Sequence, residues 1–206
     1  QQVGDRVAAQ VDLDRLLAIA DSAPDRSVPS MPDGTILSAE RVRIGIAHDQ
    51  AFGFYYSEDL DTLRASNVDL VQLDTLHAST LPQVDGLIIG GGFPEMFMTP
   101  LQANASLRAS IRSAIESGLP TYAECGGLMY LSRTLAWKGQ TCEMVGVVPG
   151  DTVMHERPVG RGYARLQPTG DDRWQEADSI PAHEFHYSSL ENLPADSIYA
   201  YAVTRG

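Results

Sequence analysis

The chain has 206 residues, 43% of them hydrophobic, and a formal net charge of −12 at pH 7, so it can bury a sizeable core and is most simply one domain with an appendage. The acidic balance and the 15 scattered Lys and Arg residues argue against a nucleic-acid partner, because phosphate binding depends on clustered basic side chains. The sequence has no membrane-spanning apolar run, no signal-peptide pattern and only two cysteines, which predicts a cytoplasmic protein without a membrane partner or a disulfide framework.

The first forty residues differ in character from the rest. Residues 11–20 place their apolar side chains on one side at helical spacing, which predicts an amphipathic helix whose apolar face needs a partner. Residues 21–40 contain three prolines, a glycine and several Ser and Asp residues, which is the composition of a linker. We therefore predict a boundary near Arg41 and a new domain from Val42 onward.

The next segments alternate between strand and helix. Residues 42–47, 69–73 and 84–89 are short apolar runs typical of buried strands, and helices are predicted from Ser57 and over residues 101–118. Such alternation favours parallel strands with right-handed crossovers, and hence an α/β fold: a three-layer sandwich with a mostly parallel central sheet. The aromatic-rich loop at residues 48–56 is either a lid over the core edge or a ligand-facing segment.

The third predicted strand ends in three glycines, Gly90 to Gly92, followed by Phe93, Pro94 and Glu95. Ligands bind α/β sheets at the carboxyl ends of the strands, and glycines there let backbone N–H groups face a bound atom. The position of Pro94 and the lack of a Lys-Ser/Thr pair argue against a dinucleotide or P-loop site. We interpret the turn as an oxyanion hole, and the alternative is a glycine-rich turn without a chemical role.

The most informative stretch is residues 119–131, where a short strand turns into a helix at Cys125, with apolar residues as far as Leu135 at helical spacing. A nucleophile on such a turn needs small residues two positions before and after it, and Ala123 and Gly127 meet this requirement. The partial positive charge of the helix N-terminus favours the thiolate, which is the attacking form. Cys125 is therefore a candidate nucleophile for acyl transfer, and the alternative is a buried, inert cysteine.

The C-terminal part has a different pattern. Residues 144–148, 162–166 and 198–203 are short strand candidates between turn residues, and they predict antiparallel strands added to the edge of the parallel sheet. His183 and His186 lie in a segment that looks extended, which places them on opposite faces and argues against a metal site. They are either hydrogen-bonded structural residues or a base for Cys125.

Together, the segments at residues 90–95, 122–131 and 183–188 resemble the glutamine amidotransferase domain of cobyrinic acid a,c-diamide synthases, which has a class I type glutaminase fold. The resemblance extends through residues 51–56, 144–147 and 162–163, so it covers essentially the whole chain from Val42 onward. It implies that Cys125 attacks the side-chain amide of glutamine and that the backbone of Gly92 and Gly126 holds the oxyanion. Further substrate-site or structural positions are Gly91, Glu95, Glu124, His183 and His186.

The resemblance also has implications for the complete protein. Residues 1–41 are expected to be the remnant of an ATP-dependent synthetase domain with a linker, and residues 42–206 the amidotransferase domain without its C-terminal end. The complete enzyme would use glutamine, ATP and Mg²⁺ to amidate acetate carboxylates of a cobyrinic acid-like tetrapyrrole, which binds mainly to the synthetase domain. No GxxxxGK[ST] motif occurs in this chain, so we expect it to hold no cofactor and no metal itself. A homodimer is left open.

The sequence departs from the family pattern in two places, and each departure leaves alternatives open. The family carries its catalytic histidine downstream of residues 183–188, and this sequence ends at Gly206 before such a segment. Because a glutaminase needs a base near the thiol, the chain is a fragment, is inactive by itself, or relies on His183 or His186. Residues 157–163 differ from the commoner form of the family, which leaves a sirohaem or sirohydrochlorin substrate open. The competing functions are a non-catalytic docking module and a different cysteine hydrolase, such as a peptidase.

Overall fold

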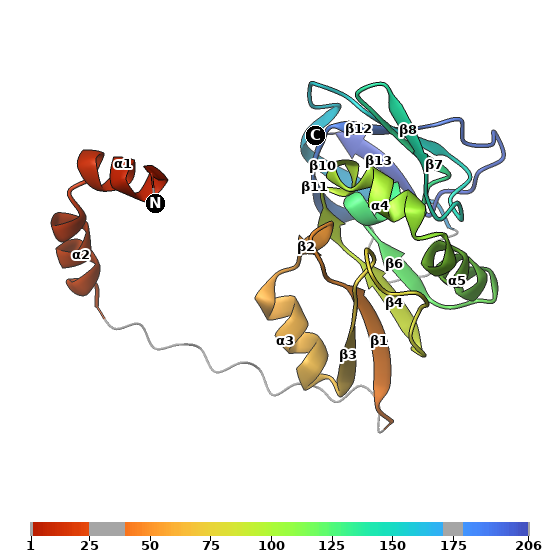
Figure 1. Cartoon of the computed structure of the whole chain (residues 1–206), viewed down its shortest axis with the longest axis horizontal. Coiled ribbons are helices and arrows are strands. Elements are labelled where there is room, and N and C mark those ends of the chain that lie inside the picture. The colour runs from red at the N-terminus through yellow and green to blue at the C-terminus, as the bar shows by residue number, and fades with distance from the viewer. Residues whose placement is uncertain (1, 25–39, 171–178, 206) are drawn as a thin grey trace. The chain divides into compact units, whose positions relative to one another are not determined.

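The computed structural model describes residues 2–24, 40–170 and 179–205, and its contacts divide the chain into two units, Gln1–Gly34 and Thr35–Gly206 (Figure 1). The first unit contains α1 (Gln2–Gln10), which the sequence did not predict, and α2 (Leu13–Asp21), and neither helix has a buried side chain. Asp12 begins α2 because its side chain accepts a hydrogen bond from the Arg15 N–H at 3.0 Å. Most of the predicted linker lies outside the described residues.

The second unit is built on a four-stranded parallel sheet in the order β3-β1-β4-β6, which confirms the predicted sheet. β1 (Val42–Ala47) pairs with β3 (Val68–Leu73) on one side and with β4 (Gly86–Ile89) on the other, and β6 (Thr121–Ala123) follows β4. The chain leaves β1 to one side for β3 and then crosses back to β4. This reversal places the topological switch point between β1 and β4, at whose carboxyl ends α/β folds bind ligands.

Three helices accompany this sheet: α3 (Ser57–Ala65), α4 (Met98–Ala103) and α5 (Ala105–Glu116). Figure 1 shows α3 and α5 on opposite sides of the sheet, as right-handed crossovers in opposite directions require. The single helix predicted over residues 101–118 is divided at Asn104. The Asn104 side chain accepts the Leu107 N–H at 3.4 Å and donates to two carbonyls in the loop after β3, so it ends one helix and begins the next.

The C-terminal half adds two further sheets. One contains β11 (Ile180–His186), β10 (Gly160–Pro168) and β13 (Tyr201–Arg205), and the other contains β12 (Ser188–Glu191), β9 (Asp151–Met154), β7 (Thr134–Trp137) and β8 (Gln140–Glu143). Two of the three predicted antiparallel strands are present, in β10 and β13, but they lie in a sheet of their own instead of extending the edge of the parallel sheet.

The strand predicted at residues 144–148 does not form. Four N–H groups of this segment donate to the carbonyls of residues 130–133, at the end of α6 (Gly126–Leu131), at 2.9 to 3.0 Å. The segment thereby satisfies the free carbonyls at a helix end instead of a strand ladder. These hydrogen bonds lie where α6 ends, at Leu131. Leu135, which was predicted on the helix, therefore lies on β7.

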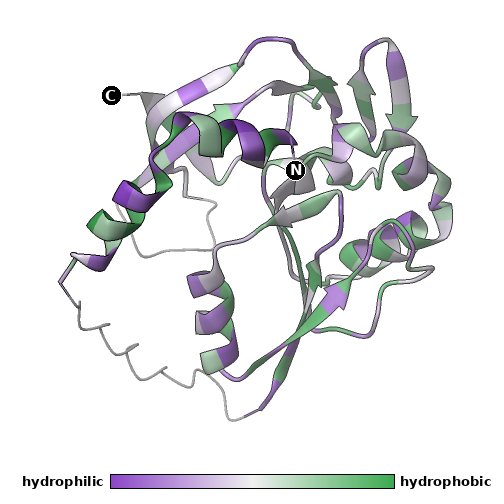
Figure 2. Cartoon of the chain, turned by 60° about the vertical axis from the view of Figure 1, so that its left-hand side comes forward, coloured by the Kyte–Doolittle hydropathy of each residue, from purple (hydrophilic) through white to green (hydrophobic). Residues whose placement is uncertain are grey.

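The core lies where the parallel sheet, α4, α5 and α6 meet. Its largest fully buried side chains include Tyr130, Phe52, Leu87, Leu107 and Ile111. The rings of Phe52 and Tyr130 pack with their centroids 5.4 Å apart, which joins the loop after β1 to α6. Figure 2 shows the strands of the parallel sheet as mostly hydrophobic, whereas α3 and α5 carry residues of both kinds. This pattern is expected of helices that cover a buried sheet.

The Arg133–Asp151 ion pair yields a prediction about acid stability. The Arg133 guanidinium, at 2.7 and 3.2 Å, and the Asn192 amide lower the pKa of Asp151 from 3.8 to about 2. A carboxylate whose pKa is lower in the folded state contributes stability above its unfolded pKa and loses it as the pH falls through the folded value. In acid titrations followed by circular dichroism, the free energy of unfolding of Asp151→Asn should fall less steeply between pH 4 and 2 than that of the wild type. Asp61→Asn, which removes an exposed pair within α3, is the control, and equal slopes in all three proteins would contradict the prediction.

Candidate active site

Cys125 lies on the turn between β6 and α6, with φ 50° and ψ −114°. A non-glycine residue at positive φ is strained, and such strain is common at functional residues that their surroundings hold in place. The Cys125 side chain is exposed, whereas Cys142 is 1% exposed and fits the description of a buried, inert cysteine. The predicted strand-to-helix turn is therefore observed, with its thiol accessible.

The turn is tight because backbone packs directly on backbone where Gly127 meets the end of β4. A Cβ on Gly127 would collide with the carbonyl oxygen of Ile89, at the end of β4. The Gly127 N–H also donates to the Gly90 carbonyl at 3.1 Å. The first turn of α6 is therefore fixed directly to the glycine turn that follows β4.

The glycine turn continues as β5 (Gly91–Gly92), which pairs with β2 (Phe52–Phe54), and leads into the short 3₁₀ helix η1 (Pro94–Met96). A Cβ on Gly91 would lie 3.8 Å from the Cβ of Cys125, and a Cβ on Gly126 would lie 3.0 Å from the backbone nitrogen of Gly92. The structure thus brings Gly91, Gly92, Cys125 and Gly126 together. These are four of the residues that the sequence singled out.

A pocket of about 570 Å³ opens at Cys125. Glu124, Leu128 and Met129 form one side of it, and the other side comes from β9, the segment before β10, and β11 and β12: Thr152, Val159, His183, Glu184, Phe185, His186, Ser188, Ser189 and Leu190. Both predicted histidines contribute to the lining of the pocket at Cys125, but they lie on opposite faces of β11, as the extended segment predicted. The parallel sheet supplies the thiol, and the later strands supply the opposite wall.

The two histidines have different surroundings. The His186 Nδ1–H donates to the Ser188 carbonyl at 2.8 Å, and Nε2 lies 3.4 Å from Oε2 of Glu184. A Cβ on Gly160 would collide with His186, so this glycine makes the room in which the His186–Glu184 pair lies. The exposed ring of His183 packs edge-on against the ring of Tyr163, with the two ring centroids 5.6 Å apart. Glu184 and Gly160 were missed as site residues, although Glu184 lies within the segment that carried the resemblance.

Two carboxylates flank the glycine turn and the nucleophile. The Tyr122 hydroxyl donates to Oε2 of Glu124 at 2.8 Å, and burial together with Glu124 raises the pKa of Tyr122 to about 12, so this donor keeps its proton at neutral pH. Glu95, on η1, is half-buried, and burial raises its pKa. Glu124 lines the pocket, whereas Glu95 is not among the described residues that do.

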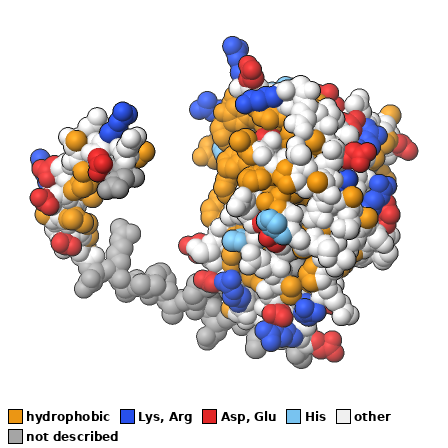
Figure 3. Space-filling view, viewed as in Figure 1, with side chains coloured by type: hydrophobic (Ala, Val, Ile, Leu, Met, Phe, Trp, Pro, Cys, Tyr) orange, Lys and Arg blue, Asp and Glu red, His pale blue; other side chains and the backbone are white. Residues whose placement is uncertain are grey.

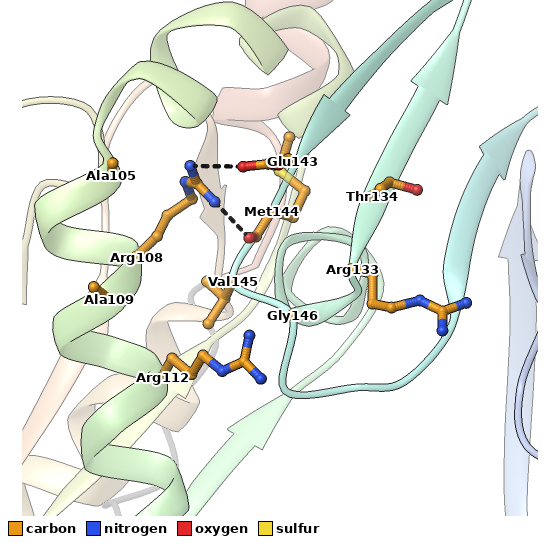
Figure 4. A pocket seen from close by; sticks show the side chains of 10 residues that line it. All are labelled: Ala105, Arg108, Ala109, Arg112, Arg133, Thr134, Glu143, Met144, Val145 and Gly146. Carbon is orange, nitrogen blue, oxygen red and sulfur yellow. Dashed lines mark hydrogen bonds and ion pairs between the residues drawn. The ribbon is translucent and has the colours of Figure 1, made fainter.

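A second pocket, of about 410 Å³, lies between α5 and the segment at residues 143–146, and Figure 4 shows its arginines. Arg108 donates to the Met144 carbonyl at 2.8 Å, Arg112 pairs with Glu116, and Arg133 points away from the pocket toward β9. Each of these guanidinium groups is already engaged by a group of the protein, and Arg108 ties α5 to the segment at residues 143–146.

The described part of the chain lacks two further features. Among these residues, no three His, Cys, Asp or Glu side chains are grouped in the way that a metal ion requires. None of the described helices has the length and apolar character needed to cross a membrane.

Comparisons with known proteins found both a matching family profile and curated relatives. A family profile described as the CobB/CobQ-like glutamine amidotransferase domain matches residues 43–205. The cobyrinate a,c-diamide synthase of Magnetococcus marinus is 44% identical over 212 residues, covering 100% of this chain and 45% of the relative. The protein of the same name from Methanosarcina acetivorans is 40% identical over 219 residues, covering 95% of this chain and 43% of the relative. The chain thus spans less than half the length of these curated relatives.

A solved structure supports the fold. The crystal structure of a glutamine amidotransferase from Thermotoga maritima superposes with a TM-score of 0.54, covering 79% of this chain and 67% of that chain at 15% sequence identity. At this identity the likeness concerns the architecture alone, namely the parallel sheet with its flanking helices.

The contact between Gly127 and β4 predicts a sharp effect of one methyl group. Gly127→Ala should lower the free energy of unfolding by about 1–3 kcal/mol, because backbone atoms cannot yield to the new Cβ as a flexible side chain would. Gly53→Ala is the matched control, since the nearest atom to its Cβ would lie 3.7 Å away. Urea unfolding of both variants measures the difference, and equal stabilities would show that α6 does not pack on β4 as described.

Proposed function

The chain belongs to the CobB/CobQ-like glutamine amidotransferase domain family, and from this premise we propose that Cys125 hydrolyses the side-chain amide of glutamine. The thiolate attacks the amide carbon, and the carbonyl electrons move to oxygen. Proton transfer to nitrogen then expels ammonia and leaves a γ-glutamyl thioester. Water adds to the thioester, glutamate leaves, and the thiol is restored.

The observation that carries the proposal is the convergence of the strained Cys125 with the glycine turn. In both tetrahedral intermediates, negative charge develops on an oxygen beside the cysteine. The N–H groups of Gly92 and Gly126 are the proposed donors, because a Cβ on Gly126 would lie 3.0 Å from the backbone nitrogen of Gly92, so the two glycines meet directly beside the cysteine. Removing one such donor in a hydrolase typically costs about 10²–10³-fold in kcat, which is why their placement dominates the chemistry.

The pocket wall suits the amino-acid end of glutamine. Glu124 and Glu184 line the cavity together with His183 and His186, and glutamine carries one ammonium and one carboxylate group. We assign recognition of these charged groups to this wall. The Nδ1–H bond of His186 to Ser188 leaves Nε2 as the ring atom that faces Glu184.

We assign the proton acceptor for the Cys125 thiol to a downstream segment of a longer chain. The family resemblance implies a histidine downstream of residues 183–188, so we propose that a longer chain carries the base and that His183 and His186 are substrate-wall residues. A longer chain in which both are replaced by Gln should then still form a thioester, with a raised KM for glutamine.

Trapping of the nucleophile tests the proposed hydrolysis. In a longer chain that includes the downstream segment, diazo-oxonorleucine, a glutamine analogue with an electrophilic group, should form a stable adduct on Cys125 that mass spectrometry detects. Cys125→Ser should abolish both the adduct and glutamine hydrolysis, whereas Cys142→Ser should retain both, because Cys142 is buried in the core. Absence of labelling in the wild-type protein would favour a non-catalytic docking module instead.

We infer the activity of the whole protein from the names of its longer relatives. Those of more than twice this length are named cobyrinate a,c-diamide synthase, so we propose that this chain supplies ammonia to a synthetase half of the same polypeptide. That half would use ATP and Mg²⁺ to activate acetate carboxylates of a cobyrinic acid-like tetrapyrrole. A sirohaem or sirohydrochlorin substrate is the alternative, since the macrocycle is selected outside this chain.

We infer the docking site of the proposed synthetase half from the surface around the pocket. Phe54, Phe93, Phe185 and Tyr187, here called the aromatic rim, are each between 38% and 58% exposed. They form two edge-on pairs, Phe54–Phe93 beside the glycine turn and Phe185–Tyr187 at the opposite wall. Figure 3 shows hydrophobic side chains gathered on this flank, over β2, β10 and β11. Exposed apolar surface around a site that releases ammonia suits a partner that excludes water there.

Substitutions in the rim should uncouple ammonia from its use. In the full-length protein, Phe54→Ser or Tyr187→Ser should lower the ratio of amide product to glutamine hydrolysed by about threefold or more, because a loosened interface lets ammonia escape. Glutamine hydrolysis and synthesis from added ammonium salt should stay near wild-type levels in Tyr187→Ser, whereas Phe54 packs against Gly91, so Phe54→Ser is judged by the ratio alone. Ile198→Ser changes a side chain that is 79% exposed outside the rim and should leave the ratio unchanged. Unchanged coupling in the rim variants would place the interface elsewhere.

A further inference from the structure

The hydroxyl of Tyr55 is inserted between two strands of the parallel sheet. It donates to the Ala47 carbonyl at 2.6 Å and accepts the Gly90 N–H at 2.9 Å. Ala47 is the last residue of β1, and Gly90 follows the last residue of β4. The paired residues of the two strands end at Ile46 and Ile88. In a parallel ladder the next rung would run from the Gly90 N–H to the Ala47 carbonyl, so the hydroxyl takes the place of that rung.

The insertion lies at the topological switch point between β1 and β4, on the side of their carboxyl ends. A hydroxyl between donor and acceptor holds the strands farther apart than a direct hydrogen bond would. The Tyr55 ring packs against the glycine turn as well, because a Cβ on Gly90 would lie 2.6 Å from its Cε1. The Tyr55 side chain is therefore held against the glycine turn both by a hydrogen bond and by the close packing of its ring.

The Gly90 peptide connects Tyr55 to the nucleophile turn. The Gly90 N–H is held by Tyr55, and the Gly90 carbonyl accepts the Gly127 N–H at 3.1 Å. One hydroxyl thus fixes a residue that is bonded directly to the first turn of α6, two positions after Cys125. Burial raises the pKa of Tyr55, so the hydroxyl keeps the proton that it donates.

We propose that Tyr55 is a positioning residue for glutamine hydrolysis, whose hydroxyl holds the Gly90–Gly92 turn at the distance from Cys125 that the developing oxyanion requires. The inference rests on the proposed function, because it assigns a role in that reaction. Tyr55 is not among the described residues that line the pocket at Cys125, so its proposed action is through the backbone of the turn. Without the hydroxyl the turn is free to relax toward β1, and the oxyanion donors then move away from the reacting carbonyl.

Tyr55→Phe tests this role in the full-length protein, since it removes the hydroxyl and keeps the ring. We expect kcat for glutamine hydrolysis to fall by about 10- to 100-fold, with KM changed less than about threefold, because the missing stabilisation belongs to the transition state. Alkylation of Cys125 by iodoacetamide, a displacement that forms no oxyanion, should keep its wild-type rate. This contrast separates a misplaced turn from a damaged nucleophile.

Tyr56→Phe is the matched control, because this neighbouring tyrosine is 78% exposed. Gly90→Ala is a second variant, which pushes the Tyr55 ring away from the turn and should reproduce the loss in kcat even if Tyr55→Phe proves too unstable to assay. The inference is overturned if Tyr55→Phe matches Tyr56→Phe in kcat, or if alkylation falls in parallel with kcat. If the wild-type protein does not hydrolyse glutamine, the proposed function itself fails, and the positioning role fails with it.

Discussion

The carbonyl oxygens of Ala51 and Ile89 occupy the space that a side chain on Gly92 or Gly127 would need. This packing of backbone on backbone fixes the glycine turn and the first turn of α6 against the carboxyl end of β4. It also explains how Cys125 is held at positive φ, a conformation that costs of order 1–3 kcal/mol and persists only where neighbours leave no alternative. The reactive geometry is therefore a property of the sheet end and does not depend on the cysteine alone.

The two parts of the second unit contribute different groups to the pocket and its surroundings. The parallel sheet positions the thiol and the proposed oxyanion donors, which are backbone groups at strand ends. The later sheets contribute side chains to the opposite wall of the pocket, chiefly from β11 and β12. Rigid strand ends suit the reacting atoms, whereas a wall of varied side chains suits recognition of the substrate's charged groups.

Local patterns predicted the parts of the site whose structure is local. The strand-to-helix turn at Cys125 and the glycine turn after β4 were identified from glycine spacing and apolar runs, because close backbone contacts restrict which residues fit. Residues 144–148 read as a strand because they are apolar, but the free carbonyls at the end of α6 take their N–H groups. The room that Gly160 leaves for His186 depends on the pairing of β10 with β11, which no local pattern encodes. Asn104, in contrast, carried a readable helix-start signal inside a predicted helix.

The loop at residues 48–56 was left open between a lid and a ligand-facing segment, and its hydrogen bonds identify it as a scaffold. The Asp49 carboxylate accepts four hydrogen bonds at 2.6 to 3.1 Å, from the N–H groups of Ala51 and Phe52 and from the N–H and hydroxyl of Thr75. These bonds fix the loop to the end of β3 and set the Ala51 carbonyl, which packs on Gly92 and accepts the Phe93 N–H. A segment with so many internal bonds is costly to open, since each buried donor would lose its partner. The aromatic side chains that project from it are therefore presented by a rigid frame.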